Sequence, residues 1–277
     1  MNQTGDIPQK TSSNKTVAII PARYASTRLP GKALIEIAGK PMVCWVAERA
    51  QAAQNVDRVI VATDSQEIID AVSSRGIEAM LTDVNHTSGT DRVAEVAAKI
   101  PEAEIVVNVQ GDEPLISPET IEKAVATMQS EIAKPNGAGI VTTCEPITSH
   151  DELLNFDLVK VVMDDDRNAV YFSRSPIPFP RDATKRHGGS PQRALENEPE
   201  LFKIFRKHTG LYVYRRDVLL EFTRWPQTQL ELTEALEQLR ALAHGVKIKV
   251  VEACSTSIGV DTPEDLELLK SQMVENT

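Results

Sequence analysis

The feature that most constrains the fold of this chain is an alternation of short apolar segments with longer amphipathic ones over its first 140 residues. The apolar segments are "VAII" (17–20), "RVIVAT" (58–63), "EAML" (78–81) and "EIVVNVQ" (104–110). Their continuous hydrophobicity is typical of strands covered on both faces. Amphipathic segments, each typical of a helix, occupy 40–53, 65–76, 90–100 and 117–134. This order predicts an α/β fold whose parallel sheet has right-handed crossovers.

The order of the elements changes after about residue 140. Strand-like segments at 139–147, 158–164, 169–174 and 209–216 follow with few helices between them, which predicts a mixed or antiparallel extension of the sheet. The polar, proline-bearing stretch 176–207 is interpreted as a long loop or a weakly structured insertion, with room for a helix at its end. The pattern then predicts one helix over 230–245, a strand over 247–253 and a closing helix over 262–273.

The charge distribution indicates a local anion site on an acidic protein. The formal net charge is -10 and the pI is about 5.1, yet no acid occurs between Lys15 and Ile35. An acidic chain lacks the basic face expected of a protein that coats nucleic acid. No apolar run approaches the roughly 20 residues that span a bilayer, and residues 1–14 lack the apolar core of a signal peptide. We therefore expect a flexible polar tail over 1–14 and a cytoplasmic enzyme that binds a small anion.

Polar clusters follow three of the predicted strands: "PARYASTRLPGK", "TDS" and "QGDEP". In an open parallel sheet, ligands bind beyond the carboxyl ends of the strands, so these clusters should converge. Arg23, Arg28 and Lys32 in the first cluster suit phosphate oxygens, since a triphosphate carries several negative charges. The loop is not a Walker motif and contains no GxGxxG fingerprint. The alternative is a solvated basic loop.

Two aspartates are candidate ligands of a hard cation such as Mg²⁺. Asp112 follows Gly111 at the end of a buried strand, and Asp261 precedes the closing helix. Glu113 is a less favoured alternative to Asp112, which could also be an ordinary turn residue. Thr262 is the expected cap of the closing helix, which would leave Asp261 available; the alternative is that Asp261 itself is the cap.

The cysteines give no sign of a metal site or of disulfides. Cys44, Cys144 and Cys254 are odd in number and far apart in the sequence. We expect all three to be buried, reduced thiols.

Taken together, the motifs resemble the 3-deoxy-manno-octulosonate cytidylyltransferase (CMP-Kdo synthetase) family from about Val17 to Leu269. The resemblance is carried by "IIPARYASTRLPGK", "IVATD", "SGTDRVAE", "VNVQGDEPLI", "YFSR", "KHTGLYVYR", "LEQLRAL" and "GVDTPEDLE". It implies a three-layer α/β/α, Rossmann-like nucleotidyltransferase domain over 15–273 with a mainly parallel mixed sheet. It also implies an extension of roughly 150–225 that contributes to sugar binding and to a homodimer.

The implied reaction is attack of the anomeric hydroxyl of Kdo on the α-phosphorus of CTP, with Mg²⁺, giving CMP-Kdo and pyrophosphate for lipopolysaccharide biosynthesis. By resemblance, Arg23, Lys32, Asp112 and Asp261 are the catalytic residues, and the two aspartates bind the metal. The resemblance also implies a set of substrate-binding residues around the nucleotide and the sugar. They are Ala22, Arg28, Ser88, Gly89, Gln110, Arg174, His208, Tyr212, Glu237 and Gln238.

Within this set, Ser88 and Gly89 would lie beside the cytosine and Gln110 between nucleotide and sugar. Arg174 would bind the sugar carboxylate. Judged without the resemblance, Glu237 and Gln238 would be solvent-facing positions of a helix. On the 90–100 helix, Arg92 and Glu95 could form an ordinary helix pair and are not assigned to the site.

Other activities remain open at this point. The sugar could be a related acidic one, 8-amino-Kdo or a sialic acid, because residues 182–205, Leu232, Thr233 and Thr209 depart from the family pattern. A nucleotide-binding regulator without turnover is disfavoured by the complete set of cations and acids. A glycosyltransferase would need a D-x-D metal pair; "DDDR" (164–167) contains one, but we interpret it as a solvated turn.

Overall fold

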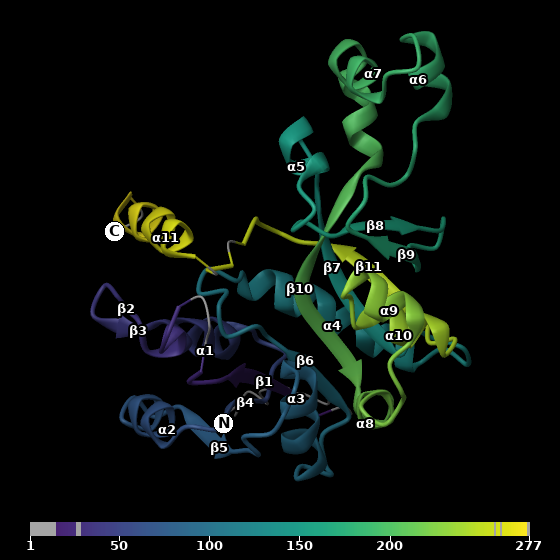
Figure 1. Ribbon diagram of the computed structural model, residues 1–277. Helices are drawn as coiled ribbons and strands as arrows, with labels where there is room; N and C mark the ends of the chain where they lie inside the picture. Colours follow the sequence, from purple (N-terminus) through teal and green to yellow (C-terminus); the bar gives the residue numbers. More distant parts are fainter. Residues whose placement is uncertain (1–14, 26–28, 258, 261, 276–277) are drawn as a thin grey trace, which may run out of the picture.

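The computed structural model describes residues 15–25, 29–257, 259–260 and 262–275. A sheet of nine strands lies at its centre (Figure 1). Seven strands cross it in the order β11 (Ile248–Glu252), β7 (Ile140–Pro146), β10 (Arg206–Arg215), β6 (Ile105–Asn108), β1 (Thr16–Ala22), β4 (Arg58–Thr63) and β5 (Glu78–Leu81). The predicted α/β class, with a mainly parallel mixed sheet, is confirmed.

Strand direction divides the sheet as the sequence pattern indicated. β6, β1, β4 and β5 are parallel, and β11 is parallel to β7. β10 runs antiparallel to both of its neighbours, β6 and β7. An antiparallel hairpin of β8 (Lys160–Met163) and β9 (Ala169–Ser173) joins the edge of β10. A short hairpin of β2 (Glu36–Ile37) and β3 (Lys40–Pro41) lies apart from this sheet.

Both faces of the sheet are buried, which explains the continuous apolar runs. Along β1, Ala18 and Ile20 belong to one hydrophobic cluster and Val17 and Ile19 to another. The first cluster includes residues of α1 (Met42–Ala52), α2 (Gln66–Ser73) and α4 (Pro118–Ile132). The second includes residues of α3 (Gly89–Ala98), α8 (Arg216–Phe222) and α10 (Gln238–Ala243). Each fully buried Ile or Val side chain stabilises the fold by about 1.5–3 kcal/mol.

The predicted helix starts agree with the capping chemistry of the sequence. Ser117 caps α4 by accepting a hydrogen bond from the Thr120 N–H, and Pro118 occupies the first turn. In α11 (Pro263–Glu275), Thr262 Oγ1 accepts from the Asp265 N–H and the Thr262 N–H donates to the Asp265 carboxylate. Thr262 therefore fills the capping position, as expected.

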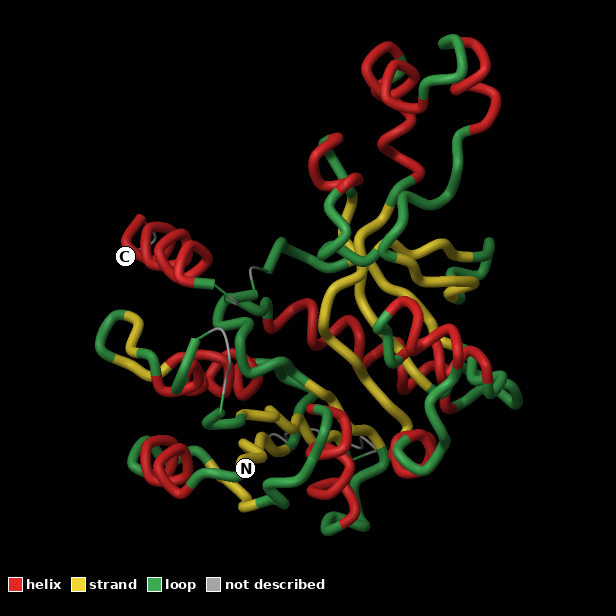
Figure 2. The backbone as a smooth tube through the Cα atoms, viewed as in Figure 1, coloured by secondary structure: helices red, strands yellow, loops and turns green. Residues whose placement is uncertain are grey.

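Residues 176–207 do not form a long loop, so that prediction is wrong. They contain α6 (Arg181–Arg186), α7 (Pro191–Asn197) and the 3-10 helix η2 (Pro199–Ile204). With α5 (His150–Leu154) they form a projection that we call the lobe, residues 147–158 and 174–205, which stands away from the sheet (Figure 1). Figure 2 shows that helices and loops make up its tip. Ile147, Leu153, Leu195 and Phe205 give the lobe its own small hydrophobic core.

The single helix predicted over 230–245 is also wrong, because it is broken into α9 (Gln229–Glu234) and α10. Ala235 adopts a left-handed conformation with φ of 53° and ends α9. The break allows Glu231 in α9 to form a buried ion pair with Arg240 in α10. Neither glycine nor proline marks this break in the sequence.

Two smaller expectations can also be checked. Cys44 and Cys144 are buried, free thiols as expected, but Cys254 is exposed, because it follows the end of β11. Across the described part of the chain, no helix combines the length and the apolar character needed to cross a membrane.

Candidate active site

A cavity of about 360 Å³ opens at the carboxyl ends of the central parallel strands. Its wall is built by the end of β1 and the loop that follows, by the start of α3 and by the turn after β6. The predicted site residues on this wall are Ala22, Arg23, Lys32, Ser88, Gly89, Gln110 and Asp112. The fold thus brings segments far apart in the sequence together at the carboxyl edge of the sheet, where we expected a ligand to bind.

Gly111 is required by the packing of the sheet itself. A Cβ atom at this position would lie 2.7 Å from the carbonyl oxygen of Pro21 in β1. The turn that presents Gln110 and Asp112 can therefore press against β1 only because Gly111 has no side chain. The close approach that Gly111 permits is thus to the backbone of β1.

Lys32 and Asp112 form an ion pair on the cavity wall. Lys32 Nζ lies 2.7 Å from Asp112 Oδ2, and the two side chains are 14% and 32% exposed. Lys32 begins the short helix η1 (Lys32–Leu34), which follows Gly31 in a left-handed conformation. A predicted phosphate-binding cation and a predicted metal-binding carboxylate thus meet at one point of the cavity.

Arg28 and Asp261 lie outside the described residues. The chain next to Asp261 is nevertheless placed, because the Val260 N–H donates a 2.9 Å hydrogen bond to the carbonyl oxygen of Asp112. Val260, the residue before Asp261 in the sequence, therefore lies beside Asp112.

Glu113, the alternative metal ligand, is in a different environment from Asp112. Burial raises the pKa of Glu113 to about 7, and the neighbouring carboxylates of Asp112 and Glu145 add to the rise. A carboxyl that is partly protonated at neutral pH is a poorer cation ligand than one that is fully ionised. Asp112 also lines the cavity, whereas Glu113 does not.

The start of α3 forms the wall opposite the basic loop. Ser88 caps the helix, since its Oγ accepts from the Asp91 N–H at 3.1 Å. Gly89 packs beneath Pro21, whose Cγ would be 3.4 Å from a Cβ at that position. The Ser88 hydroxyl is only the acceptor in this bond, so it keeps its own proton to donate.

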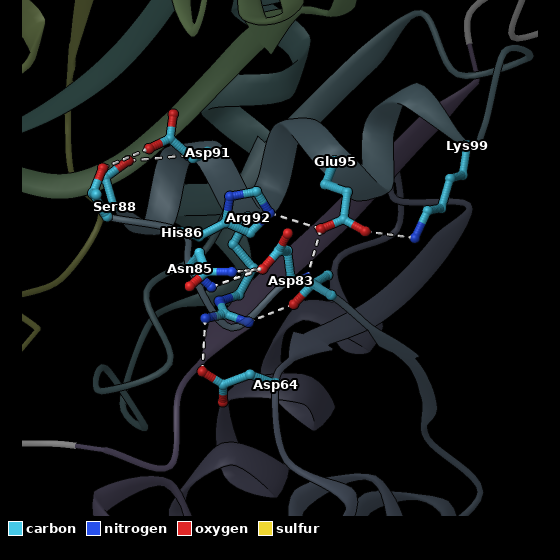
Figure 3. Close-up of polar contacts among 11 residues, drawn as sticks. Asp64, Asp83, Asn85, His86, Ser88, Asp91, Arg92, Glu95 and Lys99 are labelled. Carbon is cyan, nitrogen blue, oxygen red and sulfur yellow. Dashed lines mark hydrogen bonds and ion pairs between the residues drawn. The ribbon is translucent and has the colours of Figure 1, made fainter.

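Arg92 and Glu95 do not pair with each other, in contrast to the simple helix pair considered above. Arg92 lines the cavity and forms an ion pair with Asp64, 2.9 Å away, just after β4 (Figure 3). Glu95 accepts hydrogen bonds from the Asp83 N–H and the His86 ring, at 2.9 and 2.7 Å (Figure 3). Burial raises the pKa of Glu95, but hydrogen bonds led by that from Lys99 outweigh it and hold the pKa at about 2. Sequence reasoning missed Arg92 because its partner is remote in the chain.

His208 and Tyr212, two of the predicted sugar-binding residues, lie on β10. Burial lowers the pKa of His208 to about 3, so its ring is neutral at physiological pH. Thr142 Oγ1 donates to the Leu211 carbonyl at 2.8 Å and lies 2.8 Å from His208 Nε2. Since the threonine proton is already used, Nε2 must be the protonated nitrogen, which makes Nδ1 a hydrogen-bond acceptor. The Tyr212 ring packs against His208 at 5.3 Å, and burial raises the pKa of its hydroxyl.

Arg174 is held by backbone carbonyls. Its guanidinium donates to Glu234 O at 2.7 Å, Phe156 O at 3.0 Å and Ala235 O at 3.4 Å. These contacts tie the turn between α9 and α10 to the end of β9. In this arrangement the predicted carboxylate-binding arginine supports the turn that precedes Glu237.

Glu237 is half-buried and Gln238 is buried, so neither is the simple surface position of a helix considered above. Glu237 Oε2 accepts a 2.7 Å hydrogen bond from Thr90 Oγ1, and Gln238 is 6% exposed. Thr90 follows Gly89 directly on α3. Thr90, which sequence reasoning did not select, thus connects the start of α3 with Glu237, a predicted sugar-binding residue.

Gln110 makes a second connection between these groups. Its Nε2 donates to Gly210 O at 3.5 Å, and Gly210 lies between His208 and Tyr212 on β10. Hydrogen bonds thus connect the cavity wall with β10 and α10. The predicted sugar-binding residues do not themselves line the cavity; they are Arg174, His208, Tyr212, Glu237 and Gln238.

The D-x-D sequence at 164–167 is a turn, as interpreted. Asp164 lies between β8 and β9 and accepts hydrogen bonds from the backbone and side chain of Asn168. The Asn168 side chain and backbone lower the pKa of Asp164.

Comparison with known families gives a match over residues 17–248 to a family described as cytidylyltransferase. A 3-deoxy-manno-octulosonate cytidylyltransferase from Geobacter sulfurreducens is 51% identical over 254 residues, covering 90% of this chain and 96% of that protein. One of the same name from Pseudomonas fluorescens is 48% identical, covering 93% and 98%.

Solved structures agree with this relationship. A CMP:2-keto-3-deoxy-manno-octonic acid synthetase complexed with CTP superposes with a TM-score of 0.84 at 41% identity, covering 95% of this chain and 100% of the other. A cytidylyltransferase from Leptospira borgpetersenii, at 17% identity and a TM-score of 0.60, covers 95% of this chain and 87% of its own and shares the fold.

Proposed function

Since this chain belongs to the 3-deoxy-manno-octulosonate cytidylyltransferase family, we propose that it transfers CMP from CTP to the anomeric hydroxyl of Kdo. The products are CMP-Kdo, used for lipopolysaccharide biosynthesis, and pyrophosphate. The observation that carries this proposal is the convergence of Arg23, Lys32, Gln110 and Asp112 with the start of α3 around one cavity. Cations, a carboxylate and helix-start backbone groups are what a nucleoside triphosphate requires.

The basic loop holds the triphosphate. Arg23 and Lys32 line the cavity, and Arg28 belongs to the same loop. Their charges would stabilise both the bound triphosphate and the pyrophosphate that leaves. Ala22, Ser88 and Gly89 would contact the nucleotide from the two sides of the cavity, with backbone groups matched to the edge of cytosine.

Asp112 and Asp261 would hold Mg²⁺. Among the residues that the structure describes, no group of three His, Cys, Asp or Glu side chains could bind a metal unaided. Two carboxylates that share a cation with phosphate oxygens fit this donor set, because Mg²⁺ is usually bound in this way in nucleotide sites. When bound, the metal would neutralise phosphate charge and polarise the phosphoryl group.

The acidic sugar would bind along β10 and α10. The neutral His208 ring can accept a hydrogen bond from a sugar hydroxyl at Nδ1, and the Tyr212 hydroxyl, Glu237 and Gln238 add further hydrogen-bonding groups. Arg174 would release a backbone carbonyl to meet the sugar carboxylate. Gln110 lies where the two substrates would meet.

We further propose a single nucleotidyltransferase domain over 15–273 that works in the cytoplasm as a homodimer. CTP is a cytoplasmic nucleotide. The lobe supports the dimer, since Leu154, Phe156, Phe179 and Ile204 are all at least 46% exposed there.

A steady-state assay of pyrophosphate release tests the activity. The protein should turn over with CTP and Kdo, lose activity in EDTA and regain it with Mg²⁺. 8-Amino-Kdo and sialic acid should support much slower release. Turnover with another acidic sugar but not with Kdo would refute the substrate assignment, and full activity in EDTA would refute the role of the aspartates.

A further inference from the structure

Arg92, which lines the nucleotide cavity, forms a shielded ion pair with Asp64, the residue just after β4. Their side chains are 4% and 11% exposed, and Arg92 Nη2 lies 2.9 Å from Asp64 Oδ2. Arg92 Nη1 donates to Thr82 Oγ1, so the guanidinium is held at two points (Figure 3). Such a pair is costly to bury unless its geometry is good, and removing one partner leaves the other charge uncompensated.

The second oxygen of Asp64 holds the basic loop. Asp64 Oδ1 accepts a 3.3 Å hydrogen bond from the Tyr24 N–H, and the Tyr24 carbonyl accepts one from the Gly31 N–H at the same distance. Tyr24 directly follows Arg23. The backbone that positions Arg23 is therefore fixed by a carboxylate on a different strand.

This arrangement creates an electrostatic problem that Arg92 solves. A carboxylate beside a site for a triphosphate repels the ligand, and like charges close together at a binding site cost several kcal/mol. Arg92 lines the same cavity as Arg23 and Lys32 and pairs directly with the carboxylate. The acid can then anchor the loop without weakening the positive field of the site.

We propose that Asp64 and Arg92 are a positioning pair for the nucleotidyl transfer, in which Asp64 fixes the backbone beside Arg23 and Arg92 cancels the charge of Asp64. This inference rests on the proposed function. One turn further along α3, Glu95 holds the 83–86 loop and not the basic loop. Within α3, Arg92 thus acts on the basic loop through Asp64, and Glu95 acts on the 83–86 loop.

The decisive experiment is a rescue, measured as the KM for CTP in wild-type protein, Arg92→Gln, Asp64→Asn and the double variant. Arg92→Gln leaves Asp64 unneutralised, so KM should rise about tenfold or more and rise further at low salt. Asp64→Asn keeps an oxygen for the Tyr24 N–H, so KM should stay within about twofold of wild type. In the double variant, Asp64→Asn should return KM to near the wild-type value.

Asp64→Ala gives an independent measurement if Arg92→Gln does not fold. It removes the acceptor, so KM should rise about tenfold, in contrast to Asp64→Asn. The matched control is Arg58→Gln, which breaks the exposed ion pair with Glu78 at the other end of β4 and should leave KM unchanged.

Two results would overturn the inference: a double variant as impaired as Arg92→Gln, which would mean that Arg92 binds the ligand directly, or equal KM values for Asp64→Ala and Asp64→Asn. Failure of the wild-type protein to bind CTP would instead refute the proposed function.

Discussion

At the scale of single residues, the ion pair between Lys32 and Asp112 links the two proposed tasks of the site. Both groups are only partly exposed, and each satisfies the other in the structure. When CTP and Mg²⁺ bind, the lysine would exchange a carboxylate oxygen for phosphate oxygens, while the carboxylate would turn to the cation. Lys32 and Asp112 would then each have a partner of opposite charge both before and after the substrates bind.

Asp112→Asn tests this assignment. The variant should lose at least about 100-fold in pyrophosphate release, because an amide cannot replace an anionic ligand of Mg²⁺. Its free energy of unfolding should change by no more than about 1 kcal/mol, since a partly exposed ion pair contributes little. Asp164→Asn, in the β8–β9 turn, is the control and should keep its turnover. The reverse pattern would favour the glycosyltransferase interpretation.

His208 leads to a pH prediction. The native pKa is about 3, whereas an unfolded histidine has a pKa of about 6.5. As pH falls from 6.5 towards 3, the unfolded chain gains a proton that the native ring excludes, so this residue lowers stability over that range. Urea unfolding should show a shallower loss of stability with acid in His208→Gln than in wild type. An NMR titration of the His208 ring with a midpoint near 6.5 would contradict the assignment.

At the scale of elements, β10 pairs with β6 and β7 in the sheet and also carries two predicted sugar-binding residues, His208 and Tyr212. Its register with β7 shifts between Thr209 and Tyr212, next to Gly210. A Cβ at Gly210 would lie 2.7 Å from Glu113 Oε1 and 3.1 Å from Gln110 Cγ. A side chain at this position would therefore displace the side chains of Glu113 and Gln110 in the turn after β6.

Gly210→Ala should displace Gln110 and raise the KM for Kdo more than the KM for CTP. The matched control is Gly139→Ala before β7, where the new Cβ meets Val218 at 2.9 Å and Val246 at 3.1 Å. Overpacking there should cost about 1–3 kcal/mol of stability without changing either KM. Equal changes in both KM values for Gly210→Ala would argue against a role at the sugar side.

The elements that the sequence predicted are those whose signals are local. Buried parallel strands produce continuous apolar runs, and Ser117 with Pro118 marks the start of a helix. The same signal, Ser190 followed by Pro191, begins α7 inside the stretch interpreted as a loop, where high polarity concealed it. The break at Ala235 has no local signal, because it is stabilised by the remote contacts of Arg174 and by the Glu231–Arg240 pair.

In the candidate site, too, the residues with local signals could be predicted and those that depend on remote contacts could not. Loops at the carboxyl ends of parallel strands could be grouped from the sequence, since the fold class decides where these ends meet. Arg92 could not be assigned, because its partner is 28 residues away and its helix position is compatible with an ordinary surface pair. The partners of Arg174 and Glu237 likewise become known only when α9, α10 and α3 are packed together.

At the scale of the whole molecule, the lobe carries large apolar side chains that the single chain leaves uncovered. Phe156 and Phe179 are 68% and 62% exposed. If these residues form the proposed homodimer interface, the double variant Phe156→Asp and Phe179→Asp should elute as a monomer with the mass of one chain by light scattering. Leu81→Asp, an equally drastic change on the edge strand β5, should leave the dimer intact. A wild-type monomer would refute the dimer.

The long strand β10 starts at the base of the lobe, crosses the sheet and ends just before α8, and it carries His208 and Tyr212 (Figure 1). Because one strand joins the lobe to the sheet, a change in the position of the lobe would also move His208 and Tyr212. A substitution that shifts the base of the lobe would therefore affect these two predicted sugar-binding residues without contacting a substrate.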